Sequence, residues 1–161
     1  MTQVSDPVGT NEGPEKSEVE LLSFHVGDHE YSVDIMSVRE IRGWTHTTSL
    51  PHSPSFVRGV INLRGTVLPV LDLDQRLGLP HSEPCDRNVI IVIDVDGRGI
   101  GLRVDAVSDI LSLPIDALKP PPDVASGGDE TFLKALTIID DRMVRVLDLS
   151  ALLPPFGEAA A

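Results

Sequence analysis

The chain repeats its own hydrophobic pattern, and this repeat restricts the folds open to it more than any other feature. Apolar residues alternate with more polar ones in LLSFHV at 21–26, and the same alternation recurs 69 residues later in IIVIDV at 90–95. Farther along, VLDL occurs at 70–73 and again, 76 residues later, at 146–149. Self-similarity with conserved order indicates two copies of one structural unit.

Within each copy the dominant period is two, which is the period of a half-buried β-strand. Gly27-Asp28 and Asp96-Gly97 each divide a pair of such runs, as expected for hairpin turns. The segment GVINLRGTVLPVLDL at 59–73 holds another pair of runs, divided by Arg64-Gly65. In the second copy the dividing residues are Asp140-Asp141. Each copy therefore contains two predicted hairpins.

We predict an all-β protein built from two small five-stranded barrels related by the internal repeat, with short helical turns. The barrels are expected at about 20–79 and 89–155, and an exchange of strands between them is left open. Strands such as VIIVI at 89–93 are apolar on both faces, which fits strands covered by the neighbouring barrel or by another protein. Residues 1–17 are expected to form a disordered tail and 154–161 a frayed C-terminus.

Composition excludes several classes of function. The formal net charge of −12 argues against nucleic acid, because phosphate binding needs clustered Lys and Arg. No apolar run approaches the roughly 20 residues of a membrane-spanning helix, and the N-terminus is not a secretory signal. Cys85 is the only cysteine, so neither an internal disulfide nor a CxxC site is available. We expect a cytoplasmic protein without direct membrane insertion.

The patterns that resemble catalytic or metal sites lack the structural context that such sites need. His25 and His29 are four residues apart, a spacing that aligns ligands on a helix but not on a strand and its turn. The segment at 94–105 matches a calcium loop at three Asp positions, yet no helical pattern flanks it. The glycines at 97–101 lie within strand periodicity and not between a strand and a helix. We predict no cofactor, no metal and no enzymatic activity; the alternative is an enzyme with a metal or nucleotide site.

Three longer segments together resemble one known family. FHVGDHEYSVDIMSVREIRGW at 24–44, PSFVRGVINLRGTVLPVLDL at 54–73 and GIGLRVDAVSDILSL at 99–113 are similar to the CheW family of bacterial chemotaxis adaptors. The similarity covers about 18–153. It implies two five-stranded SH3-like barrels and a non-catalytic protein that couples chemoreceptors to the histidine kinase CheA. One surface is expected to bind the cytoplasmic tip of methyl-accepting chemoreceptors, and another the regulatory domain of CheA, within membrane-associated receptor arrays.

The resemblance also implies two sets of site residues. The receptor-binding set is Ile35, Val38, Glu40, Arg64, Ile100 and Val107, and the kinase-binding set is Gly59, Val89 and Ile110. A receptor helix needs an aliphatic groove with one or two charges at its rim. Structural alternatives stay open: Val38, Ile100 and Val107 as core, Arg64 as a solvated turn residue, Glu40 as an arginine's partner, and Gly59 as a glycine required where strands approach closely.

Two other functions are compatible with the same fold. CheW-like scaffolds also serve twitching motility and other chemosensory-type pathways, which the sequence does not distinguish. A regulatory domain cut from a CheA-type kinase is a further alternative, although the starting Met1 and the tail before residue 18 argue against it.

Overall fold

The computed structural model describes residues 18–121 and 132–153, and these residues form ten β-strands with four short helical turns. The strands are β1 (Glu18–Val26), β2 (His29–Asp34), β3 (Val38–Gly43), β4 (Val57–Leu63), β5 (Thr66–Asp72), β6 (Val89–Val95), β7 (Arg98–Val104), β8 (Ala106–Pro114), β9 (Leu133–Ile139) and β10 (Arg142–Leu147). The helical turns are η2 (Ile35–Ser37), α2 (Leu73–Arg76), η3 (Ile115–Ala117) and α3 (Leu149–Leu152). The expected tails at 1–17 and 154–161 lie outside the described residues.

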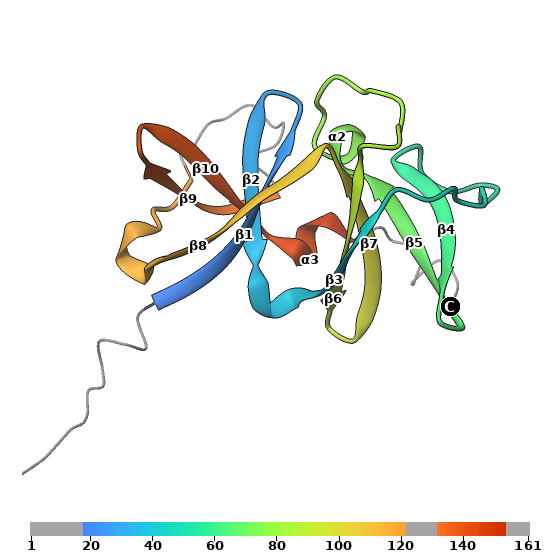
Figure 1. The fold of residues 1–161 in the computed structure, drawn as a ribbon, viewed down its shortest axis with the longest axis horizontal. Helices are drawn as coiled ribbons and strands as arrows, with labels where there is room; N and C mark the ends of the chain where they lie inside the picture. The colour runs from blue at the N-terminus through green and yellow to red at the C-terminus, as the bar shows by residue number, and fades with distance from the viewer. Residues whose placement is uncertain (1–17, 122–131, 154–161) are drawn as a thin grey trace, which may run out of the picture.

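The strands form two five-stranded sheets, which lie side by side along the length of the molecule (Figure 1). We call the sheet of order β3-β6-β7-β5-β4 the first barrel and the sheet of order β8-β1-β2-β10-β9 the second barrel. The α3 turn lies between them (Figure 1). The predicted all-β class with short helical turns is confirmed.

The internal repeat is present element by element. β1, β2 and β3 correspond to β6, β7 and β8 at the spacing of 69 residues, and β4, β5 and α2 correspond to β9, β10 and α3 at the spacing of 76. Each barrel contains one parallel pair of strands, β5 with β7 in the first and β2 with β10 in the second. The correspondence therefore includes the pairing of strands as well as their order.

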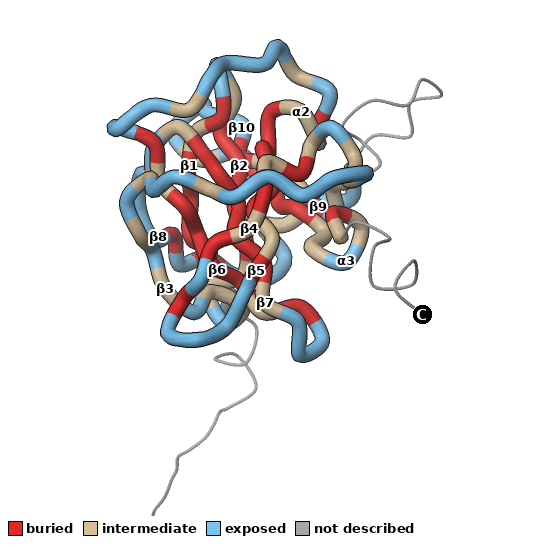
Figure 2. Tube along the Cα trace, turned by 90° about the vertical axis from the view of Figure 1, so that its right-hand side faces the viewer, coloured by how far each residue is buried: buried red, intermediate tan, exposed pale blue. Residues whose placement is uncertain are grey.

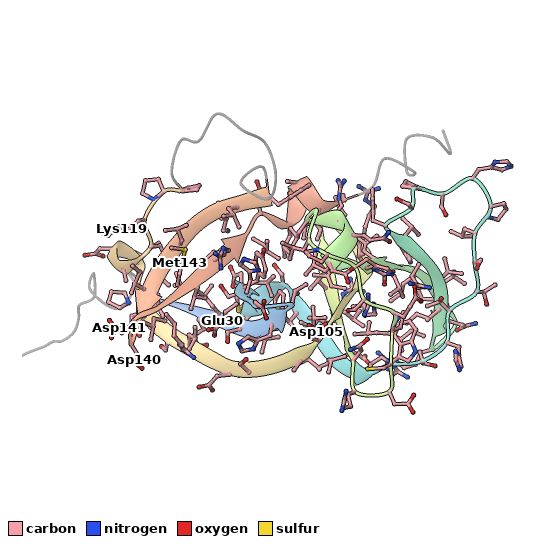
Figure 3. The ribbon with its side chains drawn as sticks, turned by 90° about the horizontal axis from the view of Figure 1, so that it is seen from above. Glu30, Asp105, Lys119, Asp140, Asp141 and Met143 are labelled. Atoms are coloured by element: carbon pink, nitrogen blue, oxygen red, sulfur yellow. The ribbon has the colours of Figure 1, made fainter. Side chains whose placement is uncertain are left out.

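The boundaries of the two barrels require a correction, because neither barrel is a continuous segment such as 20–79 or 89–155. The β1–β2 hairpin lies in the second barrel, between β8 and β10, and the β6–β7 hairpin lies in the first, between β3 and β5. Strands are thus exchanged between the repeats. The chain crosses over at η2 and again at Asp105, which lies near the middle of the molecule (Figure 3). Asp105 is held there because its carboxylate accepts a hydrogen bond of 2.8 Å from the backbone N–H of Gly27.

Each sheet closes into a barrel by a backbone bridge. The segment that follows one edge strand pairs with the edge strand on the opposite side of the sheet. In the first barrel, Thr48 and Val60 exchange two backbone hydrogen bonds of 2.9 and 2.8 Å. In the second barrel, Lys119 and Leu136 exchange two backbone hydrogen bonds of 2.8 Å. Val60 and Leu136 are equivalent positions of the repeat, so both barrels close at the same point.

The hydrophobic core has three parts, one inside each barrel and a larger one between them. Strand β1 contributes Phe24 to the core between the barrels and Leu21 to the interior of the second barrel. Strand β6 likewise contributes Ile93 to the shared core and Ile90 to the interior of the first barrel. Figure 2 shows these buried segments enclosed by exposed loops. The apolar seam expected between the barrels is therefore present, and it explains why β6 is apolar on both faces.

Candidate functional site

The predicted aliphatic residues of the receptor site gather where the chain crosses between the barrels. Val38 opposes Ile93, which opposes Ile100, so these three residues form one row across β3, β6 and β7. Val107, Phe24 and Tyr31 form the equivalent row across β8, β1 and β2. Ile35, Val38 and Val107 are half-buried and pack against the core between the barrels. These three side chains thus combine a core contact with an accessible face.

Ile100 differs from the other members of this set. Its exposure is 2%, because β7 is the central strand of the first barrel and the neighbouring barrel covers its outer face. The prediction that Ile100 lines an exposed groove is therefore wrong, and the alternative of a core residue is confirmed. Ile100 lies in the same cross-strand row as Val38, with Ile93 between them.

The charged members of the receptor site form an ion pair. Arg64 and Gly65 occupy the tip between β4 and β5 with positive φ angles of 50° and 85°. The Arg64 side chain is 71% exposed, and its guanidinium donates to the carboxylate of Glu40 on β3. Glu40 also accepts a hydrogen bond of 3.1 Å from Arg42. Because β3 and β4 are the two edges of the sheet, the Glu40–Arg64 pair joins them at one end of the first barrel.

Both partners of this pair are held in their charged forms. Hydrogen bonds from Arg64 and then Arg42 hold the pKa of Glu40 below its usual value, and the hydrogen bond to Glu40 raises the pKa of Arg64. A shallow pocket between the two edge strands contains the pair and is completed by Arg39, Leu63, Thr66, Leu68 and Val92. The alternative that Glu40 is an arginine's structural partner is therefore observed. Arg64 nevertheless keeps most of its surface available for a partner protein.

The equivalent end of the second barrel has different chemistry. Asp109 and Asp140 stand where the first barrel has Glu40 and Arg64, so two acids replace the ion pair. A groove between β8 and β9 is lined there by Ile110, Leu111, Ser112, Leu113, Ala117, Thr137, Ile138 and Ile139. Figure 3 places Asp140, Asp141, Met143 and Lys119 together at this end of the molecule. The two barrel ends thus share a backbone plan but present different surfaces.

The three predicted kinase contacts do not form one continuous patch. Ile110 is 54% exposed on β8 of the second barrel, whereas Gly59 and Val89 lie in the first barrel. Val89 is half-buried at the start of β6. Gly59 is buried, and a Cβ atom at this position would lie 2.4 Å from the carbonyl oxygen of Thr48. The alternative that Gly59 is glycine because strands approach closely is confirmed.

A buried ionic network lies at the end of the first barrel where β5 finishes, away from the Arg64 turn. It was not predicted from the sequence. The Arg103 side chain is 1% exposed and bonds to Asp72 at 2.6 Å and to Asp74 at 3.3 Å. Burial alone would raise the pKa of Asp74, but hydrogen bonds from Ser82 and His81 together with the Arg103 charge hold it below its usual value. The signal was an arginine and two aspartates inside otherwise apolar strand and turn segments, at 70–74 and 100–104.

Neither a metal-binding cluster nor a membrane-spanning helix occurs among the described residues. Residues 18–121 and 132–153 contain no group of three His, Cys, Asp or Glu side chains placed to hold a metal ion. The Cys85 thiol is exposed and free. The same residues include no helix long and apolar enough to cross a membrane.

Comparison with known proteins agrees with this picture. The CheW-like domain family matches residues 20–155. The chemotaxis protein CheW of Rhizobium meliloti (strain 1021) is 49% identical over 142 residues, covering 88% of this chain and 92% of that protein. The chemotaxis protein CheW of Klebsiella aerogenes is 36% identical over 134 residues, covering 83% and 81%. The crystal structure of the scaffolding protein TtCheW from Thermoanaerobacter tengcongensis superposes with a TM-score of 0.78 at 31% identity, covering 83% and 91% of the two chains. From its repeat, its paired barrels and these relatives, the chain belongs to the CheW family of chemotaxis adaptor proteins.

Proposed function

We propose that this protein couples the cytoplasmic tips of methyl-accepting chemoreceptors to the histidine kinase CheA, and that it does so without catalysis. The observation that carries the proposal is the exposed Arg64 guanidinium, fixed by Glu40 at one end of the first barrel. An arginine held in this way is a preorganised contact, since its side chain is ordered before the partner arrives. The classes of partner, chemoreceptors and CheA, are proposed because the chain belongs to the CheW family.

The receptor is proposed to bind at the crossover between the barrels. Ile35, Val38 and Val107 offer apolar contact there, and each is supported from below by the core between the barrels. A helix that packs on such a surface gains affinity from apolar burial, and charged residues at the rim set its register. The Glu40–Arg64 pair is proposed to be that rim.

The regulatory domain of CheA is proposed to bind a second surface that includes Val89 and the strand containing Gly59. Ile110 lies on the other barrel and would meet a different part of the kinase or a different copy of it. In this scheme the protein resides in the cytoplasm and joins membrane-associated arrays only through its partners.

The test is co-sedimentation with receptor-containing membranes and CheA, comparing the wild type with Arg64→Glu. Charge reversal at Arg64 places two carboxylates where an ion pair stood, so receptor-dependent sedimentation is expected to fall. Arg98→Glu is the matched control, because Arg98 is an exposed arginine at another hairpin of the same barrel. Wild-type protein that binds neither partner under array-forming conditions would refute the proposal.

A further inference from the structure

Arg103 organises one end of the first barrel through hydrogen bonds to four residues on two stretches of the chain. Its guanidinium donates to Asp72 at the end of β5, to Asp74 in α2, to Asn88 before β6 and to the carbonyl of Ser82. Arg103 is among the largest fully buried side chains of the described residues. A planar guanidinium donates in fixed directions, so four acceptors around it define the relative positions of the segments that bear them.

The network also includes Arg58, the additional residue of a β-bulge in β4. The pairing of β4 with β5 shifts between Val57 and Gly59, which leaves Arg58 without a partner in the ladder. The Arg58 guanidinium contacts the Oδ2 atom of Asp72 at 2.8 Å, while Arg103 contacts the Oδ1 atom at 2.6 Å. One carboxylate is thus shared by two arginines. The second barrel has the same shift between Leu133 and Ala135, so the bulge that places Gly59 belongs to the shared fold and not to the network.

The other end of the network fixes the start of β6. The side-chain oxygen of Asn88 accepts from Arg103 at 2.8 Å and from the backbone N–H of Cys85 at 2.9 Å. The backbone carbonyl of Asn88 accepts from Trp44 at 3.1 Å. Val89 follows directly as the first residue of β6. Val89, which pairs with Gly43 and Val104 in the sheet, is therefore preceded directly by a residue that Arg103 holds.

The segment before Asn88 is also held by hydrogen bonds to Asp74 and Arg103. Asp74 accepts hydrogen bonds of 2.9 Å from the backbone N–H of Ser82 and 3.1 Å from His81. The Ser82 carbonyl in turn accepts from Arg103 at 2.8 Å. A segment with little apolar surface to bury is thus fixed by polar contacts that converge on one buried cation.

The second barrel builds its equivalent end without such a network. The position equivalent to Arg103 is Asp34, whose carboxylate accepts from the nearby backbone N–H of Met36 at 3.0 Å. The position equivalent to Asp72 is Asp148, which accepts from the backbone N–H of Ser150 at 3.2 Å. The barrel fold can therefore form with local capping interactions at these positions. The buried network is a property of one barrel end and not a requirement of the fold.

We infer that Arg103 is a positioning residue for the kinase-binding surface, acting through Asn88 on Val89. The inference depends on the proposed function, which assigns Val89 to kinase binding. A buried ion pair contributes little net stability compared with apolar residues of similar volume, so we assign this one a role in geometry. The network holds the backbone that leads into Val89 while its own members stay inside the protein.

The test measures the affinity of the full chain for the CheA regulatory domain and for receptor-containing membranes. Asn88→Ala is expected to weaken kinase binding by about tenfold and to leave receptor binding unchanged, because the receptor residues lie elsewhere. Arg103→Lys is expected to do the same, since an ammonium cannot reproduce the fork of the guanidinium. Glu30→Gln is the matched control: Glu30 is a buried acid of the second barrel that pairs with Ser23 at 2.8 Å and with Arg142 at 3.5 Å.

Amide hydrogen exchange of Val89 and of the segment 80–88 supplies a second readout, and it is expected to accelerate in Asn88→Ala but not in Glu30→Gln. If wild-type protein does not bind the kinase, the proposed function fails. If the wild type binds and Asn88→Ala binds equally well despite faster exchange, the positioning role alone is refuted. Equal loss of kinase binding in Glu30→Gln would also refute it, because general destabilisation would then explain the effect. Asn88→Ala keeps the test decisive if Arg103→Lys does not fold.

Discussion

Replacing Gly59 with alanine is expected to open the first barrel at the point where its sheet closes. The added Cβ would lie 2.4 Å from the carbonyl oxygen and 2.8 Å from the carbonyl carbon of Thr48. Both atoms belong to the backbone, so no side-chain rotation relieves the contact. The backbone that bears Thr48 must therefore move away from β4.

The cost of that movement follows from the contacts it breaks. Thr48 and Val60 share two backbone hydrogen bonds of 2.9 and 2.8 Å, and each contributes about 1 kcal/mol net. Gly59 also has a φ of 155°, a conformation that side chains rarely adopt. We expect a loss of about 2–3 kcal/mol in the free energy of unfolding. In a chain of 161 residues this corresponds to a fall in Tm of roughly 5–10 °C.

The assay is thermal unfolding followed by circular dichroism, combined with hydrogen exchange at the Val60 amide. Gly43→Ala is the matched control, because Gly43 lies in the same barrel and a Cβ there would meet no atom within 4 Å. Gly59→Ala should melt well below Gly43→Ala and should lose protection at Val60. Equal melting of the two variants, with Val60 still protected, would show that the close approach to Thr48 does not determine the stability of the closure.

Three further outcomes follow from burial and charge. Ile100→Ala should lower the free energy of unfolding by about 2–5 kcal/mol in urea titrations, whereas Ile110→Ala on the exposed face of β8 should change it by less than about 0.5 kcal/mol. Asp74 has a native pKa below its ordinary value of 3.8. Its contribution to stability is therefore present above that value and is lost as the pH falls through the native pKa. Asp74→Asn should remove this part of the acid dependence in urea titrations between about pH 2 and 5. Arg76 stacks between two phenylalanine rings and donates to three carbonyls at the end of α3, so Arg76→Met should accelerate amide exchange in α3.

The elements of the fold could be predicted from the sequence because their signals are local. A hairpin needs only an alternation of apolar residues and a turn that tolerates positive φ, and both occur around Asp96-Gly97 and Arg64-Gly65. The repeat adds a second copy of each signal, which makes every individual assignment more secure. The expected short helical turns include α2 and α3, which follow the two copies of the VLD sequence.

The exchange of hairpins had no comparable signal. The pattern of β1 shows that both of its faces are buried, but the same pattern results whichever barrel contains the strand. Only η2, three residues long, separates β2 from β3, and such a short connection fits either a continuous barrel or a crossover. Three-dimensional pairing decides between them, and it also decides which apolar residues are hidden. Ile100 was misassigned for this reason.

Arg64 and Arg103 occupy positions where the two repeats keep the backbone and reverse the charge. Arg64 corresponds to Asp140 and Arg103 to Asp34, whereas Glu40 and its equivalent Asp109 are both acidic. A substitution of opposite charge at an equivalent position cannot be required by the shared fold, since both versions form the same strands and turns. It must therefore serve something that one barrel does and the other does not. In the first barrel Arg64 pairs with Glu40 at one end and Arg103 is the centre of the buried network. The second barrel has an acidic, apolar groove at the end equivalent to Arg64, and local caps at Asp34 and Asp148 in place of the network. Two barrels of common plan thus present surfaces of different charge, as the proposed binding of two different partners requires.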